Sequence, residues 1–197
     1  MYCHKRYLHC QFSVQTDWPG GIYASPNLGG SRAGGLIAAC WASLLFFGKE
    51  GYTSKTKQII STARFLNERL KEIPGIFIYG KPLMSVVAIG SKEFNIYRLT
   101  SALTKKGWSL NMLQFPKGFH ICVTMLHTLN GVAEQFIDDV RQCTKEIMQD
   151  PKAVATGTAA VYGMSQSIPD RSLVSEVGWI FLDTCYSTDV TNGKISS

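Results

Sequence analysis

The sequence predicts an α+β domain in which an antiparallel sheet carries helices on one face. The first observation behind this prediction is a change in apolar spacing along the chain. Steps of three and four residues, typical of helices, alternate with short apolar runs that are typical of strands. The second is the order of these segments between residues 76 and 149, namely strand, strand, helix, strand, strand, helix. Strands joined by short turns pair antiparallel, which leaves the helices to one face of the sheet.

The first fifty residues have a different character. Residues 1–32 are rich in aromatic residues and glycine, and the breakers Trp18-Pro19-Gly20-Gly21 predict an extended segment rich in loops. Apolar residues then occur nearly all round the helical wheel over residues 33–48, which predicts a helix buried on several sides. The neighbours that would bury this helix need not belong to this chain, so we expect the segment to derive from another domain.

A second helix is predicted from Thr53 or Ser54, whose hydroxyls can cap free backbone N–H groups, as far as Pro74-Gly75. Two β-prone runs follow, at residues 76–79 and 85–89, joined by a turn that contains glycine and proline. These runs predict the first two strands of the sheet.

The same pattern then repeats. A helix is predicted over residues 94–106, ending at Gly107, and strands are predicted at 108–115 and 120–125. Asn130 is the predicted cap of the last long helix, which carries an apolar stripe and places Asp138-Asp139 on its solvent face. A short helix at 170–182 is predicted beyond it.

Composition limits the class of protein. The chain has 197 residues, of which 45% are hydrophobic, enough to bury one substantial core. Its net charge of +6 comes from scattered lysines and arginines, an arrangement that argues against nucleic-acid binding. Six cysteines without a CxxC pair or metal-type spacing predict reduced thiols and no metal site. No signal peptide opens the sequence, and its longest apolar stretch, residues 36–47, is too short to cross a bilayer.

One stretch combines residues that suit an anion. Glycines at 20, 21, 29, 30, 34 and 35 surround Ser31 and Arg32 just before the first helix, which offers amides, a hydroxyl and a guanidinium to a phosphate. Many glycine-rich loops only turn the chain, so this alternative stays open. No nucleophile with an adjacent base is apparent, and His120 and His127 are expected to have core or surface roles.

Co-linear motifs along almost the whole chain resemble the carboxy-terminal portion of sphingosine-1-phosphate lyases. The matching segments are Asp17-Trp18, residues 20–26, Gly30-Ser31-Arg32, Cys40-Trp41-Ala42, Gly51-Tyr52, residues 56–60, 62–66 and 96–99, Lys106-Gly107-Trp108, residues 113–116 and Tyr162-Gly163-Met164. The resemblance implies the α/β class, as the carboxy-terminal part of a fold-type-I, pyridoxal-phosphate-dependent enzyme. On this basis residues 1–50 would be a remnant of the large cofactor-binding domain with an interface loop. Residues 51–155 would be the small α+β domain, and residues 156–197 a tail.

The resemblance also implies an activity. Family members work as homodimers with active sites between subunits, anchored at the cytosolic face of the endoplasmic reticulum membrane; a chain standing alone would be cytoplasmic. They cleave sphingosine 1-phosphate, a phosphorylated sphingoid base, or its dihydro form, by a retro-aldol reaction into a long-chain aldehyde and phosphoethanolamine. Pyridoxal 5'-phosphate takes up the electrons of the broken bond.

By the same resemblance, this chain contributes to the site of the other subunit. Gly30 and Ser31 would reach the cofactor phosphate, Tyr23 would border the active site and Arg32 would support its anionic groups. Each has an alternative: Gly30 could serve a tight turn, Tyr23 could pack and Arg32 could form an ordinary ion pair. Ala33 stands where family members commonly have proline, which implies a less rigid turn.

The family's Schiff-base lysine is expected upstream of residue 1, and Lys5 only imitates the His-Lys pair that contains it. We therefore assign no catalytic residue in this chain and expect the isolated polypeptide to be inactive. Two functions stay open: a chain with the parent lyase activity, or an inactive isoform or gene-copy product that binds or perturbs the full-length enzyme.

Overall fold

The computed structural model describes residues 9–26, 32–155, 160, 163 and 168–186. The chain divides into two compact units, one made of Met1–Ser31 with Ile168–Ser197 and the other of Arg32–Ser167. These units are defined by contacts within the chain. The predicted boundaries at residues 50 and 155 concern which domain of a larger enzyme each segment derives from, and they stay a prediction.

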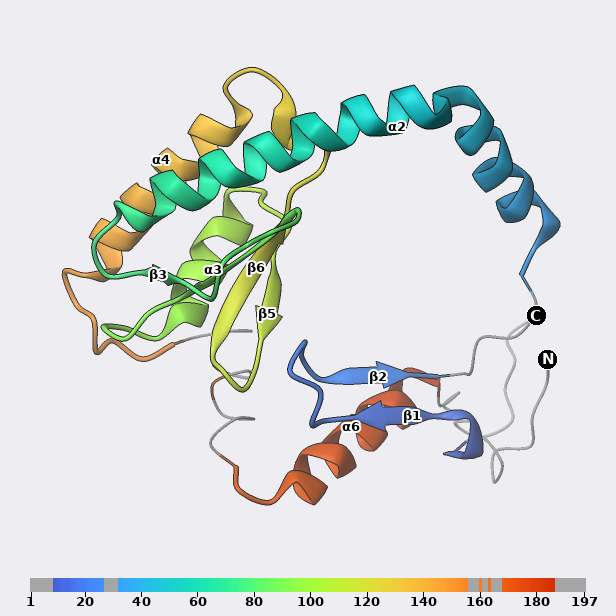
Figure 1. Cartoon of the computed structure of the whole chain (residues 1–197). Coiled ribbons are helices and arrows are strands. Elements are labelled where there is room, and N and C mark those ends of the chain that lie inside the picture. Colours follow the sequence, from blue (N-terminus) through green and yellow to red (C-terminus); the bar gives the residue numbers. More distant parts are fainter. Residues whose placement is uncertain (1–8, 27–31, 156–159, 161–162, 164–167, 187–197) are drawn as a thin grey trace, which may run out of the picture. The chain divides into compact units, whose positions relative to one another are not determined.

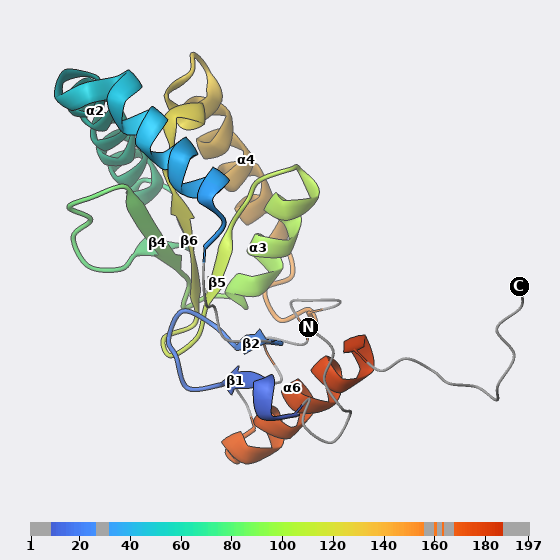
Figure 2. The ribbon, with the colours of Figure 1, turned by 90° about the vertical axis from the view of Figure 1, so that its right-hand side faces the viewer.

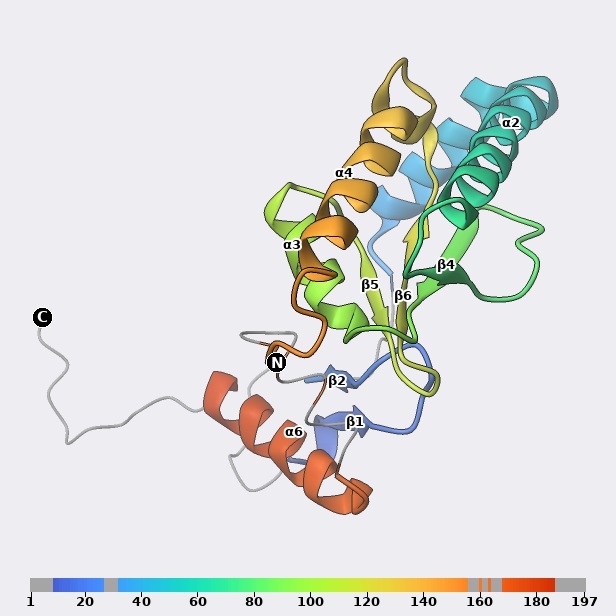
Figure 3. The same cartoon turned by 90° about the vertical axis from the view of Figure 1, so that its left-hand side faces the viewer.

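The larger unit contains a four-stranded antiparallel sheet with the order β3-β4-β6-β5. The strands are β3 (Phe77–Ile78), β4 (Val86–Gly90), β5 (Asn111–Leu113) and β6 (Gly118–Cys122). Over residues 32–155, the helices of this unit are α2 (Gly34–Lys71), α3 (Ile96–Lys105) and α4 (Val132–Ile147). The second half of α2, together with α3 and α4, covers one face of the sheet, which confirms the predicted arrangement (Figure 3).

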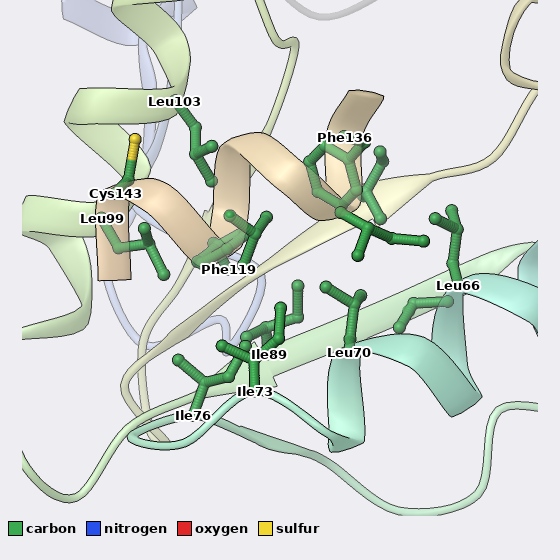
Figure 4. Packing of buried hydrophobic residues seen from close by; sticks show 14 of the residues in the cluster. Leu66, Leu70, Ile73, Ile76, Ile89, Leu99, Leu103, Phe119, Phe136 and Cys143 are labelled. Atoms are coloured by element: carbon green, nitrogen blue, oxygen red, sulfur yellow. The ribbon is translucent and has the colours of Figure 1, made fainter. Parts of the chain in front are cut away.

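The core lies between this layer of helices and the two central strands. Val87 and Ile89 of β4 and Phe119 and Ile121 of β6 are fully buried, whereas the alternating positions Val86 and Cys122 are exposed. This period of two identifies the covered face of the sheet. The helices contribute buried residues that include Leu66, Leu70, Leu99, Leu103, Phe136 and Cys143 (Figure 4).

The two predicted helices at residues 33–48 and from 53 onward are one element with a break. Helix α2 departs from helical geometry only at Gly48, where φ is 57° and ψ is −174°. The predicted end at Gly48 is therefore confirmed, but the predicted start at Thr53 or Ser54 is wrong. The Thr53 hydroxyl donates to the carbonyl of Lys49 at 2.8 Å, inside the helix, instead of capping a free N–H group.

Only residues 111–113 of the predicted strand at 108–115 form a strand, and Trp108 lies outside it. Its ring packs against Phe136 of α4 with the ring centroids 4.9 Å apart, so its apolar character reflects packing on a helix rather than a place in the ladder. The last predicted strand ends at Cys122, and Met125–Thr128 form a 3-10 helix, η2.

Asn130 does not cap α4, contrary to the prediction. Gly131 occupies the N-cap position with φ at 81°, a left-handed conformation that glycine adopts readily, and no side chain caps this end. Asn95, in contrast, caps α3, where its side-chain oxygen accepts a hydrogen bond from the N–H of Tyr97 at 3.1 Å.

The smaller unit contains a hairpin that the sequence did not predict within its extended first segment. The hairpin pairs β1 (Ser13–Gln15) with β2 (Tyr23–Ser25), and the described part of this unit also contains η1 (His9–Gln11) and α6 (Arg171–Tyr186). Helix α6 lies against the hairpin (Figure 2), and Gly178 leaves room there for Val14, whose Cγ1 lies 2.7 Å from where a Cβ would be. The predicted helix at 170–182 is confirmed and extends to Tyr186.

Candidate functional site

Tyr23, the first candidate, is placed on the surface of the smaller unit. It begins β2, pairs with Gln15 across the hairpin and is 55% exposed. The hairpin holds the backbone of Tyr23 in place while leaving its phenol ring accessible to another part of an assembly. Gly30 and Ser31, the two predicted cofactor-binding residues, lie outside the described residues.

Arg32, the fourth candidate, lies two residues before the start of α2 and is exposed. Ala33 is the N-cap residue, with extended backbone angles and no side-chain hydrogen bond to the first turn. Helix N-termini carry a partial positive charge from their free amides, and a guanidinium beside one adds a full positive charge. This end of α2 is therefore electrostatically suited to an anion.

Two glycines in the first turn of α2 leave its backbone open. A Cβ built on Gly34 or Gly35 meets no atom within 4 Å, so nothing in the described chain requires glycine at either position. Glycine in a helix costs about 1 kcal/mol relative to alanine, which makes two in succession unfavourable unless they serve another purpose. Close approach of a group from outside the chain is such a purpose.

The first half of α2 presents apolar side chains to solvent. Arg32 and the side chains of the next three turns line a shallow hollow of about 400 Å³, formed by Arg32, Leu36, Ile37, Cys40, Trp41 and Leu44. Trp41 is 64% exposed and Phe46 is 82% exposed. The helix predicted to be buried on several sides is thus exposed within this chain, and contiguous apolar surface of this kind marks an interaction site.

Two histidines, His120 and His127, lie in the larger unit. Nδ1 of His127 accepts a hydrogen bond from the N–H of Thr124 at 2.9 Å and so stabilises the start of η2. His120 lies in β6 opposite Ala88 and Asn111. Burial lowers the pKa of both imidazoles, which favours the neutral rings.

Among the charged residues, Asp139 differs most from its predicted position. It was expected on the solvent face of its helix with Asp138, yet it is buried and accepts hydrogen bonds from Lys106 and from the Trp108 indole, each at 2.8 Å. Burial alone would raise the pKa of Asp139, but the donated hydrogen bonds outweigh this effect and lower it. The carboxylate joins α4 to the end of α3.

A larger hollow, of about 520 Å³, lies between α2 and the η2–α4 segment. Its lining includes Ser61, Thr62, Phe65, His127 and Glu134. The sequence did not predict this hollow, because its lining residues come from separate segments and follow no common motif. The resemblance assigns none of these residues a role.

Comparisons with individual known proteins and with solved structures both find sphingosine-1-phosphate lyases. No family model matches the chain. Sphingosine-1-phosphate lyase of Drosophila melanogaster is 55% identical over 188 residues, which are 95% of this chain and 34% of the relative. A sphingosine-1-phosphate lyase structure from Burkholderia pseudomallei has 40% identity and a TM-score of 0.57, and the match covers 73% of this chain and 33% of that one.

A more distant structure, glutamate decarboxylase from Lactobacillus brevis, has a TM-score of 0.53 at 17% identity over 73% of this chain and 34% of that one. At this low identity, the match supports only the fold of the chain. The chain spans about a third of the length of the relatives that it matches. The resemblance drawn from the motifs is thereby confirmed over nearly the whole chain, and the chain belongs to the sphingosine-1-phosphate lyase family.

Proposed function

We propose that this chain supplies the small carboxy-terminal domain and the inter-subunit loop of a pyridoxal-phosphate-dependent lyase. The reaction is the cleavage of sphingosine 1-phosphate, or its dihydro form, to a long-chain aldehyde and phosphoethanolamine. The observation that carries the proposal is 55% identity to a sphingosine-1-phosphate lyase over 95% of the chain. Pyridoxal phosphate, when bound, supplies the conjugated ring that takes up the electrons of the broken carbon–carbon bond.

The chain's own contribution is to hold the cofactor phosphate of the other subunit. Gly30 and Ser31 contact the phosphate, and Arg32 supports the anionic groups of the site. Three features of the described residues support this role: the first turn of α2 has no side-chain cap, Arg32 adds positive charge to it, and Gly34 and Gly35 leave its backbone accessible. Such fixed positive groups bind and orient a phosphate without themselves reacting.

Tyr23 borders the same site in this proposal. Its phenol is exposed at the edge of a short hairpin, as expected of a side chain that meets another subunit. It would shape the opening through which the phosphorylated sphingoid base enters.

The assembly is a homodimer in this proposal, and the apolar first half of α2 packs against the rest of the lyase. The support is the exposed apolar surface of this half, together with relatives that are about three times as long as the chain. Within the described part of the chain, no helix is both long enough and apolar enough to cross a bilayer. A location at the cytosolic face of the endoplasmic reticulum membrane is proposed from the family alone.

The test is the affinity for pyridoxal phosphate of a lyase that contains this sequence. Ser31→Ala and Arg32→Gln should each raise the cofactor Kd about tenfold, equivalent to about 1.4 kcal/mol, because the first removes a phosphate contact and the second removes the positive charge that supports the anionic groups. Ser54→Ala, at an exposed position in the second half of α2, is the matched control and should leave the Kd unchanged. Wild-type affinity in both loop variants would refute the proposed phosphate contacts.

A further inference from the structure

Gly48 divides α2 into two halves that point in different directions. It is the single residue of this 38-residue helix with non-helical backbone angles, φ 57° and ψ −174°. The helix bends at this point (Figure 1). The residues on either side, from Gly34 to Phe47 and from Lys49 to Lys71, are helical.

The backbone of Gly48 has a conformation that side chains oppose. A positive φ with ψ near 180° lies outside the left-handed helical region and is adopted almost solely by glycine. A Cβ at this position would meet no atom within 4 Å, so the space around it is open. Glycine is therefore required here by the backbone angles and not by crowding.

Side chains next to the break stabilise the bent form. The ring of Phe47 contacts those of Phe46 and Tyr52, with centroids 5.1 and 5.3 Å apart, and the contact with Tyr52 crosses the break. A Cβ on Gly51 would lie 3.2 Å from the Cβ of Phe47, and glycine at that position leaves room for this ring. Glu50, near the start of the second half, has the charge favoured at a helix N-terminus.

The two halves have different surroundings. The second half is anchored to the sheet by Ala63, Leu66 and Leu70, which are buried in the core. The first half exposes Leu36, Trp41 and Phe46. The bend therefore sets the direction in which an apolar helix leaves a firmly packed domain.

We propose that Gly48 is a fixed elbow that aims the apolar first half of α2 away from the line of the second half. It is a positioning residue for docking: without it, α2 would continue as one straight helix and carry its apolar side chains and Arg32 to a different place. The identity of the docking surface, the rest of the lyase, rests on the proposed function. The elbow itself does not.

The experiment measures a distance across the elbow by double electron–electron resonance in the 197-residue chain. One spin label is attached to Cys40 and the other to a cysteine introduced by Lys57→Cys, while buried Cys143 is kept and the remaining cysteines are replaced by serine. A straight helix separates the backbones at these positions by about 25 Å, at 1.5 Å per residue. We expect a shorter distance in the parent chain and an increase toward the straight-helix value in Gly48→Ala.

Gly35→Ala is the matched control, because this glycine lies in regular helix with open space around it, and its distance should equal that of the parent. Circular dichroism and thermal unfolding are the folding controls. Helix content like that of the parent and a cooperative transition in each variant would show that the core, which packs on the second half of α2, is kept. A parent distance equal to that of a straight helix, or a Gly48→Ala distance equal to that of the parent, would overturn the proposal. These outcomes are independent of the cofactor-affinity test, which changes only the loop before α2.

Discussion

At the scale of single residues, Asp138 and Asp139 show how neighbours in the sequence acquire different roles. The apolar stripe of α4 predicted both on the solvent face, and Asp138 is exposed and pairs with Arg141 at 2.6 Å. Asp139 is buried because Lys106 and Trp108 reach it from the end of α3. The pattern of one helix does not contain this information, since the partners are more than thirty positions away.

We expect Asp139→Asn to lower the free energy of unfolding by about 1–2 kcal/mol, because it weakens two charge-assisted hydrogen bonds at a buried site. Since the pKa of Asp139 is lowered by folding, the stabilisation is complete above its ordinary value of 3.8 and is lost as the pH falls through the folded-state pKa. The difference in the free energy of unfolding between wild type and variant should thus become smaller below about pH 4. Urea denaturation of both proteins at several pH values measures this difference.

Asp138→Asn is the control for this prediction. Its partner is a surface arginine at the next turn, so the change should stay within about 0.5 kcal/mol. An equal loss of stability in the two variants, or a gap between Asp139→Asn and wild type that persists at low pH, would contradict the role given to Asp139.

At the scale of elements, apolar periodicity predicted the helices well but their ends less reliably. The stripes of α3 and α4 fixed which faces are buried, and glycine located the break at position 48. Capping side chains were less informative, because Thr53 and Asn130 have suitable groups that the structure does not use as caps. A hydroxyl or amide can serve a helix end, a helix interior or solvent, and only the backbone path decides among them.

The two asparagines before α3 and α4 provide a direct comparison. Asn95→Ala should lower the free energy of unfolding by about 1 kcal/mol, since it removes the acceptor for the N–H of Tyr97. Asn130→Ala should change it by less than about 0.5 kcal/mol, because Asn130 is exposed and caps nothing. Thermal unfolding of both variants measures this, and a larger loss from Asn130→Ala than from Asn95→Ala would be incompatible with the caps described.

At the scale of the whole molecule, the sequence predicted the antiparallel sheet with helices on one face, because each strand and helix carries its own periodicity. It did not predict that β6 lies between β4 and β5, since strand order depends on contacts between distant segments. The candidate site came from the family resemblance: Tyr23 and Arg32 are exposed, and the roles of all four residues, Gly30 and Ser31 included, stay predictions. The apolar first half of α2 is the feature that the chain alone does not explain.

The most direct measurement is the turnover of sphingosine 1-phosphate with added pyridoxal phosphate, by the 197-residue chain alone and by the chain co-expressed with a full-length lyase of the family. We predict no turnover by the chain alone, and a stable complex with altered turnover on co-expression; a chain carrying Ser31→Ala should form the complex without that effect. Turnover by the chain alone would contradict this account and make Lys5 the first residue to replace. Absence of a complex would contradict the proposed inter-subunit role.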